Sequence, residues 1–223
     1  MAQAVTSQPS SSDFLLTRGV AGSVTHLPRL PGAAREATAI AALLPADEVD
    51  RLDGFAANRQ KFLAGDLNRY RLIHVASHAM TDPDIPQASA LILSTVDQAG
   101  KEIDGRVLAA DFLNFRLRAE TVVLSGCDTA LGKRVDGEGL IGLRYLVLAR
   151  GAHSVVSSLW PALDQVTAEL MVKFYSSLLN QHSSVIAAWS AASRETLAGA
   201  YADPGTWGAF MLTLSNVDTL NMN

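Results

Sequence analysis

The sequence predicts an α/β protein with a mostly parallel sheet and helices on both faces. Two observations lead to this prediction. Short apolar, β-branched runs alternate along the chain with longer segments whose apolar residues recur at helical spacing. Several of the short runs are apolar throughout, which is typical of strands that are covered on both faces. Strands that alternate with helices in this way form parallel sheets between two helical layers.

The N-terminal part is predicted to begin with a leader and to continue into a strand and two helices. Residues 1–29 are expected to be a partly disordered leader because the first part is polar and rich in serine, although Phe14–Val24 is weakly strand-like. Ala33–Leu44 is predicted as a helix that the following proline ends. Val49–Leu52 is a short strand, and Ala56–Ala64 is a short helix.

The middle of the chain contains the two clearest candidates for buried strands, Leu72–Ala76 and Thr121–Ser125. Between them, Ala90–Thr95 and Lys101–Ile103 are expected to pair as a hairpin, because the four residues Asp97–Gly100 have turn chemistry. Val107–Asn114 is predicted to be a helix.

The C-terminal part is predicted to hold three helices and two strands. A glycine-rich loop leads to the first helix, which is apolar nearly all round and therefore expected to be deeply packed. The predicted helices are Leu140–Ala149, Leu163–Leu179 and Ser184–Ala198, and the predicted strands are His153–Ser158 and Ala209–Leu214.

The composition excludes several classes of protein. The chain has 223 residues, is 48% hydrophobic and 18% charged, and carries a net charge of -4, which is not the charge of a nucleic-acid-binding protein. No apolar run is long enough for a membrane helix, and no secretory signal is readable. A single cysteine excludes an intrachain disulfide and a multi-cysteine zinc site. We therefore expect a soluble, cytoplasmic protein without a metal or another cofactor.

The most reactive side chains follow the two clearest strands. His78 comes just after the strand that ends at Ala76, and Cys127 comes just after the strand that ends at Ser125. If these strands are neighbours, both side chains emerge at one edge of the sheet, where α/β proteins place their sites. An imidazole can serve as the base that makes a thiol nucleophilic, and the N–H groups of Ala79 and Cys127 can face an oxyanion. The alternative is that the cysteine is simply buried, as free cysteines usually are.

Four further features have two interpretations each. The run Gly137–Gly142 matches a dinucleotide fingerprint, but it follows its strand at too great a distance. The other interpretation is a mobile loop that leads to a closely packed helix and could also line a substrate groove, with Glu138 as a substrate-binding residue. Asp164 is either the cap of the next helix or the acidic floor of a pocket for a basic side chain. Trp160 is either a core residue or the wall of that pocket. His74 is predicted to be a buried core residue rather than a zinc ligand.

An ordered set of motifs resembles the CHAT domain, a family of caspase-like cysteine peptidases related to separase. The resemblance spans roughly Leu30 to Leu214. Its pieces are Leu30-Pro31-Gly32-Ala33 with Glu36; His74-Val75-Ala76-Ser77-His78; Leu124-Ser125-Gly126-Cys127-Asp128-Thr129; Gly137-Glu138-Gly139; Ala149-Arg150-Gly151-Ala152 with Ser157-Ser158-Leu159-Trp160; Phe174-Tyr175; and Trp207-Gly208-Ala209-Phe210.

The resemblance implies a three-layer caspase-like fold and a set of roles for named residues. His78 would be the catalytic histidine, Cys127 the nucleophile, and the amides of Ala79 and Cys127 the oxyanion hole. Asp164 would read a basic residue before the cleaved bond. The predicted domain is 30–216, followed by a tail at 217–223.

The sequence departs from the family pattern at three places. The family usually has glycine where this chain has Ala79, and alanine is common where it has Gly126. Family members often have further strands and tetratricopeptide repeats before the domain, whereas 29 residues precede Leu30 here. A missing strand would expose a sheet edge, which favours a homodimer or a regulatory repeat partner. The predicted function is a cysteine endopeptidase that cleaves proteins, and the alternative is a catalytically silent interaction module.

Overall fold

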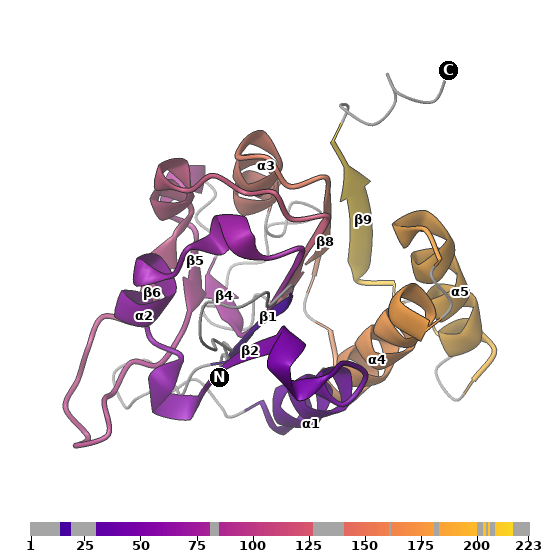
Figure 1. Ribbon diagram of the computed structural model, residues 1–223, viewed down its shortest axis with the longest axis horizontal. Helices are drawn as coiled ribbons and strands as arrows, with labels where there is room; N and C mark the ends of the chain where they lie inside the picture. The colour runs from indigo at the N-terminus through magenta and orange to yellow at the C-terminus, as the bar shows by residue number, and fades with distance from the viewer. Residues whose placement is uncertain are drawn as a thin grey trace.

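The fold is built around a six-stranded sheet that is parallel except at one edge. The computed structural model describes residues 14–18, 30–80, 85–126, 141–160, 162–180, 183–199, 203, 205 and 208–215. The strand order is β2-β1-β3-β7-β8-β9, and β9 runs antiparallel to β8 (Figure 1). The strands are β1 (Phe14–Arg18), β2 (Val49–Asp53), β3 (Leu72–Ala76), β7 (Thr121–Ser125), β8 (Ser154–Ser158) and β9 (Phe210–Leu214).

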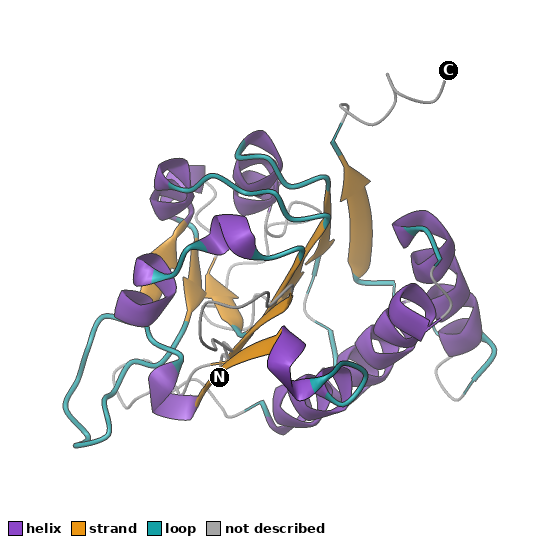
Figure 2. Cartoon of the chain, viewed as in Figure 1, coloured by secondary structure: helices purple, strands orange, loops and turns teal. Residues whose placement is uncertain are grey.

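Helices cover both faces of this sheet, which confirms the predicted three-layer α/β fold (Figure 2). One helical layer consists of α1 (Pro31–Ala41), α4 (Asp164–Asn180) and α5 (Val185–Leu197). The other consists of α2 (Arg59–Ala64), α3 (Ile141–Ala149) and the 3-10 helix η6 (Ala109–Asn114). Shorter 3-10 turns are η2 (Ala46–Glu48), η3 (Gly54–Ala56), η4 (Leu67–Arg69) and η5 (Pro86–Ala88).

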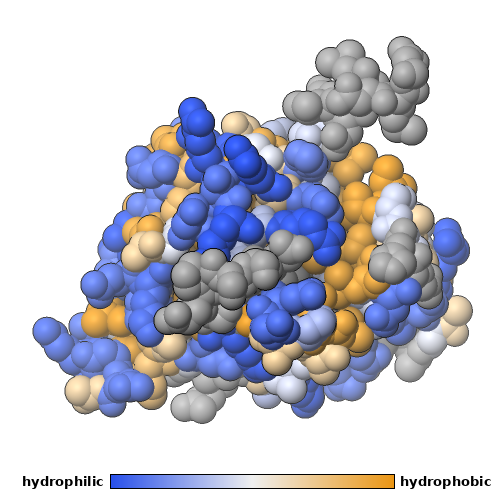
Figure 3. Space-filling view, in the orientation of Figure 1, coloured by the Kyte–Doolittle hydropathy of each residue, from blue (hydrophilic) through white to orange (hydrophobic). Residues whose placement is uncertain are grey.

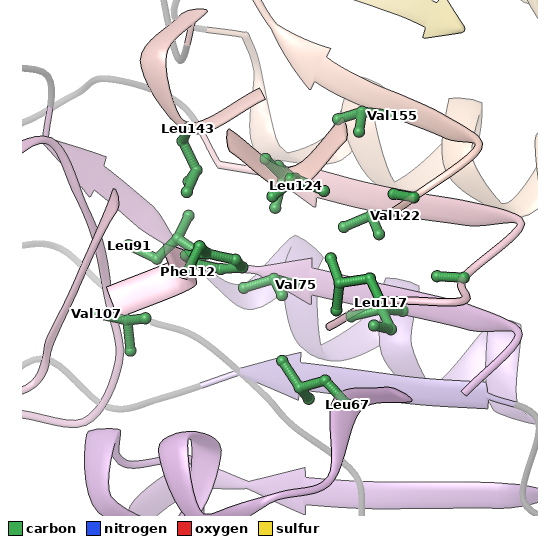
Figure 4. Packing of buried hydrophobic residues seen from close by; sticks show 14 of the residues in the cluster. Leu67, Val75, Leu91, Val107, Phe112, Leu117, Val122, Leu124, Leu143 and Val155 are labelled. Atoms are coloured by element: carbon green, nitrogen blue, oxygen red, sulfur yellow. The ribbon is translucent and has the colours of Figure 1, made fainter. Parts of the chain in front are cut away.

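Each face of the sheet has its own hydrophobic core, because successive side chains of a strand point to opposite faces. On the face of α4, Val123 packs in one cluster with Leu170 and Phe174. On the face of α3, Leu124 packs in another cluster with Leu143 (Figure 4). The central strands β3, β7 and β8 are buried along their whole length, as the apolar runs predicted.

A second, three-stranded antiparallel sheet differs from the prediction. It consists of β4 (His78–Met80), β5 (Ala90–Ile92) and β6 (Arg106–Leu108). The predicted hairpin is present next to its turn, where the N–H of Ile103 donates to the carbonyl of Thr95 at 2.9 Å and Val96 forms an antiparallel bridge with Glu102. Further from the turn, β5 pairs with β6, which was not predicted as a strand. The predicted helix Val107–Asn114 is wrong at its start, because Val107 is fully buried opposite Leu91.

The segment expected to be a leader contributes a strand to the sheet. Its strand-like part forms β1, which pairs in parallel with β2 on one side and with β3 on the other. The two edges of the described sheet are therefore β2 and β9. Met211 and Leu214 of β9 are exposed, and apolar residues gather beside this strand in Figure 3. Such an edge is where another chain can pair, and the homodimer stays a prediction.

Candidate functional site at the ends of β3 and β7

The strands that precede the two predicted catalytic residues are neighbours in the sheet. β3 and β7 pair in parallel, and Ala76 lies opposite Ser125. His78 follows Ala76 by two residues, and Cys127 follows Ser125 by two residues. The two segments therefore leave the sheet side by side at its carboxyl edge. Cys127 and Glu138 themselves lie outside the described residues.

Gly126 brings the backbone before Cys127 against the histidine segment. A Cβ at position 126 would lie 2.7 Å from the carbonyl oxygen of Ser77 and 3.4 Å from the Cβ of Ala79. Only glycine allows such an approach without a shift of the backbone. The hydroxyl of Ser158 donates a hydrogen bond to the carbonyl of Gly126, so β8 also fixes this position. The two departures from the family pattern, at positions 79 and 126, thus face each other.

His78 begins the strand β4 and is almost completely buried, with 1% of its surface exposed. It lines a small cavity of about 30 Å³. The other residues that line this cavity are Leu30, Ala33, Glu36, Ser125, Ala162, Asp164 and Thr167. Two carboxylates therefore lie around the cavity that His78 borders, which makes the surroundings of the imidazole negative.

Glu36 also belongs to a buried polar group that connects α1, β3 and α4. Its Oε1 lies 2.9 Å from Nε2 of His74, although the two are not aligned for a hydrogen bond. Nδ1 of His74 lies 3.2 Å from the hydroxyl of Tyr175. Burial, reinforced by the negative charge of Glu36, holds the pKa of Tyr175 well above its ordinary value. The prediction that His74 is a buried core residue is confirmed.

Asp164 is the first residue of α4, yet its carboxylate acts on a different helix. It accepts hydrogen bonds from the backbone N–H groups of Gly32 and Ala33, which both lie in the first turn of α1. The bond from Ala33 is 3.1 Å long. Leu30, the residue before α1, provides no side-chain cap. A Cβ at position 32 would lie 2.5 Å from Cγ of Asp164, so glycine is required there. That Asp164 also reads a substrate side chain stays a prediction.

Trp160 follows β8 at the same edge and is 40% exposed. Its indole N–H donates to the carbonyl of Gly205 at 3.3 Å, which anchors one end of the partly exposed ring. This position leaves it able to contact a ligand, and its role as a wall stays a prediction. Among the described residues, no three His, Cys, Asp or Glu side chains are grouped so that they could hold a metal ion.

Two residues near the site were not assigned a role from the sequence. Glu36 stands in the motif around α1, but nothing in its local pattern indicates that it reaches His74. Arg144 lies in a helix that is apolar nearly all round, and it is 5% exposed. Its signal is its isolation, because it is the only charged residue of Ile141–Ala149.

A three-layer fold with a mostly parallel sheet and a buried histidine at its carboxyl edge defines an α/β protein of the caspase-like class. A sequence profile of the CHAT domain matches residues 1–215, and the chain belongs to this family. The family is related to the caspase-like peptidases.

Two curated relatives match part of the chain. Tetratricopeptide repeat protein 28 of Mus musculus is 37% identical over 109 residues, which is 49% of this chain and 4% of the relative. The Homo sapiens protein of the same name is 36% identical over 109 residues, with the same coverage. The chain thus matches only a small fraction of the length of these relatives. Within the part of the chain that the structure describes, no helix is both long and apolar enough to cross a membrane.

Proposed function

We propose that the chain is a cysteine endopeptidase that cleaves protein substrates with a His78–Cys127 dyad in the cytoplasm. The observation that carries the proposal is the pairing of Ala76 with Ser125, because it starts both catalytic segments from adjacent positions of one sheet edge. The close approach of Gly126 to Ser77 and Ala79 supports it further.

The reaction uses few parts. His78 takes the thiol proton of Cys127, and the thiolate attacks the carbonyl carbon of a peptide bond. The amides of Ala79 and Cys127 hold the oxyanion that forms. His78 then gives its proton to the leaving amine, and water hydrolyses the acyl-enzyme to release the second product and the free thiol. The carboxylates of Glu36 and Asp164 stabilise the imidazolium that exists between the two proton transfers.

Substrate contacts are proposed for three residues around this edge. Trp160 offers an exposed ring, Glu138 belongs to the segment after the nucleophile, and Asp164 lines the cavity beside His78. Because the relatives are named as tetratricopeptide repeat proteins, we propose that a repeat domain or protein regulates the activity.

Cleavage of a protein mixture by purified chain tests the function. Cys127→Ala should abolish cleavage, and His78→Ala should lower its rate by at least about a thousandfold. His153→Ala is the matched control, since it removes an exposed imidazole from the amino end of β8 and should leave the rate unchanged. Cleavage that survives Cys127→Ala would rule out the mechanism.

The second candidate is a catalytically silent interaction module, and the burial of His78 is the observation that favours it. A thiol-directed probe separates the two. Rapid labelling of Cys127 near neutral pH, slowed by His78→Ala, indicates an activated thiolate. Slow labelling that is indifferent to His78 indicates the silent module.

A further inference from the structure

The α3 face of the sheet contains a buried cation for which the described residues offer no counter-charge. Arg144 is 5% exposed, and no carboxylate of the described residues pairs with it. Its Nε is buried without a hydrogen-bond partner among those residues, and its Nη1 contacts only the sulfur of Met211, at 3.4 Å. A thioether is a weak acceptor, so the guanidinium is poorly compensated.

Two buried hydroxyls lie on the same face. Val155 of β8 packs in the core beneath α3, so Ser157, two residues further along the strand, points to that face as well. Met211 pairs with Ser157 and Thr213 pairs with Val155, which places the side chains of both β9 residues there. Oγ of Ser157 and Oγ1 of Thr213 are buried and have no partner in the described part of the chain.

The group is rich in hydrogen-bond donors and lacks a strong acceptor. A guanidinium presents its donors in a planar fork that matches a carboxylate, and two hydroxyls can add further donated bonds. The group lies just beneath the surface, because Met211 is 38% exposed and the ring of Tyr145, 5.3 Å from the guanidinium carbon, is 59% exposed. A carboxylate that displaces the Met211 side chain would therefore reach Arg144.

The position of the group connects it to the proposed active site. Ser157 pairs with Leu124 of β7, three residues before Cys127, so the group lies at the carboxyl edge of the sheet. It is on the opposite face from the cavity of Glu36 and Asp164. We propose that Arg144, with Ser157 and Thr213, binds an acidic side chain of the protein substrate. This inference rests on the proposed peptidase function and names its substrate class.

Binding to the inactive Cys127→Ala chain tests the inference without catalysis. The probe is a peptide library in which one position at a time carries Asp or its neutral isostere Asn, and fluorescence anisotropy reports the affinity. At one position, the Asp peptides should bind about tenfold more tightly than the Asn peptides. Adding Arg144→Met should abolish this preference. Arg194→Met, which removes an exposed arginine from α5, is the matched control and should preserve it.

The stability of the free chain provides an independent readout. Replacing an uncompensated buried cation by an apolar side chain of similar length should raise the Tm of Arg144→Met by about 2–4 °C, whereas Arg194→Met should leave it unchanged. A fall in Tm would show that Arg144 already has an anionic partner in the chain and would overturn the inference. A preference for Asp that survives Arg144→Met, or no such preference at any position, would overturn it too.

The outcome for the peptidase is separate. If the Cys127→Ala chain shows the Arg144-dependent preference but the unmodified chain cleaves no peptide of the library, the acidic site stands and the peptidase function fails. If the unmodified chain cleaves peptides with no Asp preference, the function stands and the acidic site fails.

Discussion

At the same edge of the sheet, the two faces carry buried side chains of opposite charge. On the face of α1 and α4, the charged groups are carboxylates: Asp164 accepts two backbone N–H groups, and Oε1 of Glu36 lies 2.9 Å from Nε2 of His74. On the face of α3, the charged group is a cation whose nearest recorded acceptor is the sulfur of Met211. The first arrangement joins elements of the chain to one another, whereas the second leaves hydrogen-bonding capacity for a ligand.

The comparison also separates two electrostatic tasks. Negative charge next to His78 stabilises the imidazolium that the proposed reaction passes through. Positive charge beneath Met211, on the other side, would select an acidic side chain of the substrate. Because the sheet lies between them, the two opposite charges do not neutralise each other through a direct contact. Mutations on the two faces should therefore have stability effects of opposite sign.

The largest effect is expected for Glu36→Ala. Removing the carboxylate leaves His74 beside an empty space in a fully buried site, so the free energy of unfolding should fall by about 3 kcal/mol. Urea unfolding measures this loss. Glu195→Ala, on the exposed side of α5, is the control and should change stability by less than about 0.5 kcal/mol.

The conservative variant Glu36→Gln isolates the charge. It keeps the shape of the side chain, so its loss of stability should be smaller than that of Glu36→Ala. In the active chain it should lower the cleavage rate, because Glu36 lines the cavity beside His78. An unchanged rate would mean that Glu36 acts on the fold alone and that the two faces do not differ in catalysis.

The next effect concerns the contact between the segments that follow β3 and β7. Gly126→Ala would push a methyl group toward the Ser77 carbonyl and the Ala79 methyl, so stability should fall by about 2 kcal/mol. Adding Ala79→Gly should recover part of the loss, with a coupling energy of about 0.5–1 kcal/mol in a double-mutant cycle measured by urea unfolding. Strict additivity would show that positions 79 and 126 do not compensate for each other.

What the sequence could predict was local or followed from a simple rule of topology. The apolar runs at β3, β7 and β8 were predicted from their residues, and the rule that strands alternating with helices run parallel brought the ends of β3 and β7 to one edge. The start of η6 was missed because Val107 is held in a strand by its partner Leu91, and no local pattern distinguishes that from a helix.

The partners of the charged residues could not be predicted, because they come from distant parts of the chain. The cap of α1 is Asp164, which is 132 residues from Gly32 in sequence. Helical periodicity assigned α3 to the core, and that was correct for Leu143 and Val147. The same periodicity gave no information on the surroundings of Arg144, because its contact with Met211 comes from a strand 67 residues away.

A smaller effect is expected for Asp164→Ala, which removes the cap of α1. Two N–H groups lose their acceptor and the helix dipole loses a favourable charge, so stability should fall by about 1 kcal/mol. Asp47→Ala, at an exposed position in η2, is the matched control with no expected change. If Asp164 mainly binds a basic substrate residue, Asp164→Ala should change cleavage specificity while stability stays the same. Asp164 and Arg144 would then both bind charged substrate side chains.

The smallest effect is expected at the far end of the buried polar group, in Tyr175→Phe. Loss of the hydroxyl near Nδ1 of His74 should lower stability by about 0.5 kcal/mol at pH 7. The pKa of Tyr175 is raised in the folded chain, so the folded state holds the phenol proton more tightly than the unfolded state does. This contribution is complete below the ordinary pKa of 10.0 and is lost as pH rises from there toward the folded pKa. Tyr175→Phe should therefore lose less stability than the unmodified chain above pH 10, as urea unfolding at a series of pH values would show.

Tyr70, whose pKa is also raised by burial and by Asp50, should still produce a residual alkaline loss of stability in that variant. A further Tyr70→Phe change should remove this loss. If the free energy of unfolding falls equally at alkaline pH with and without the Tyr175 hydroxyl, deprotonation of Tyr175 does not contribute to the loss of stability.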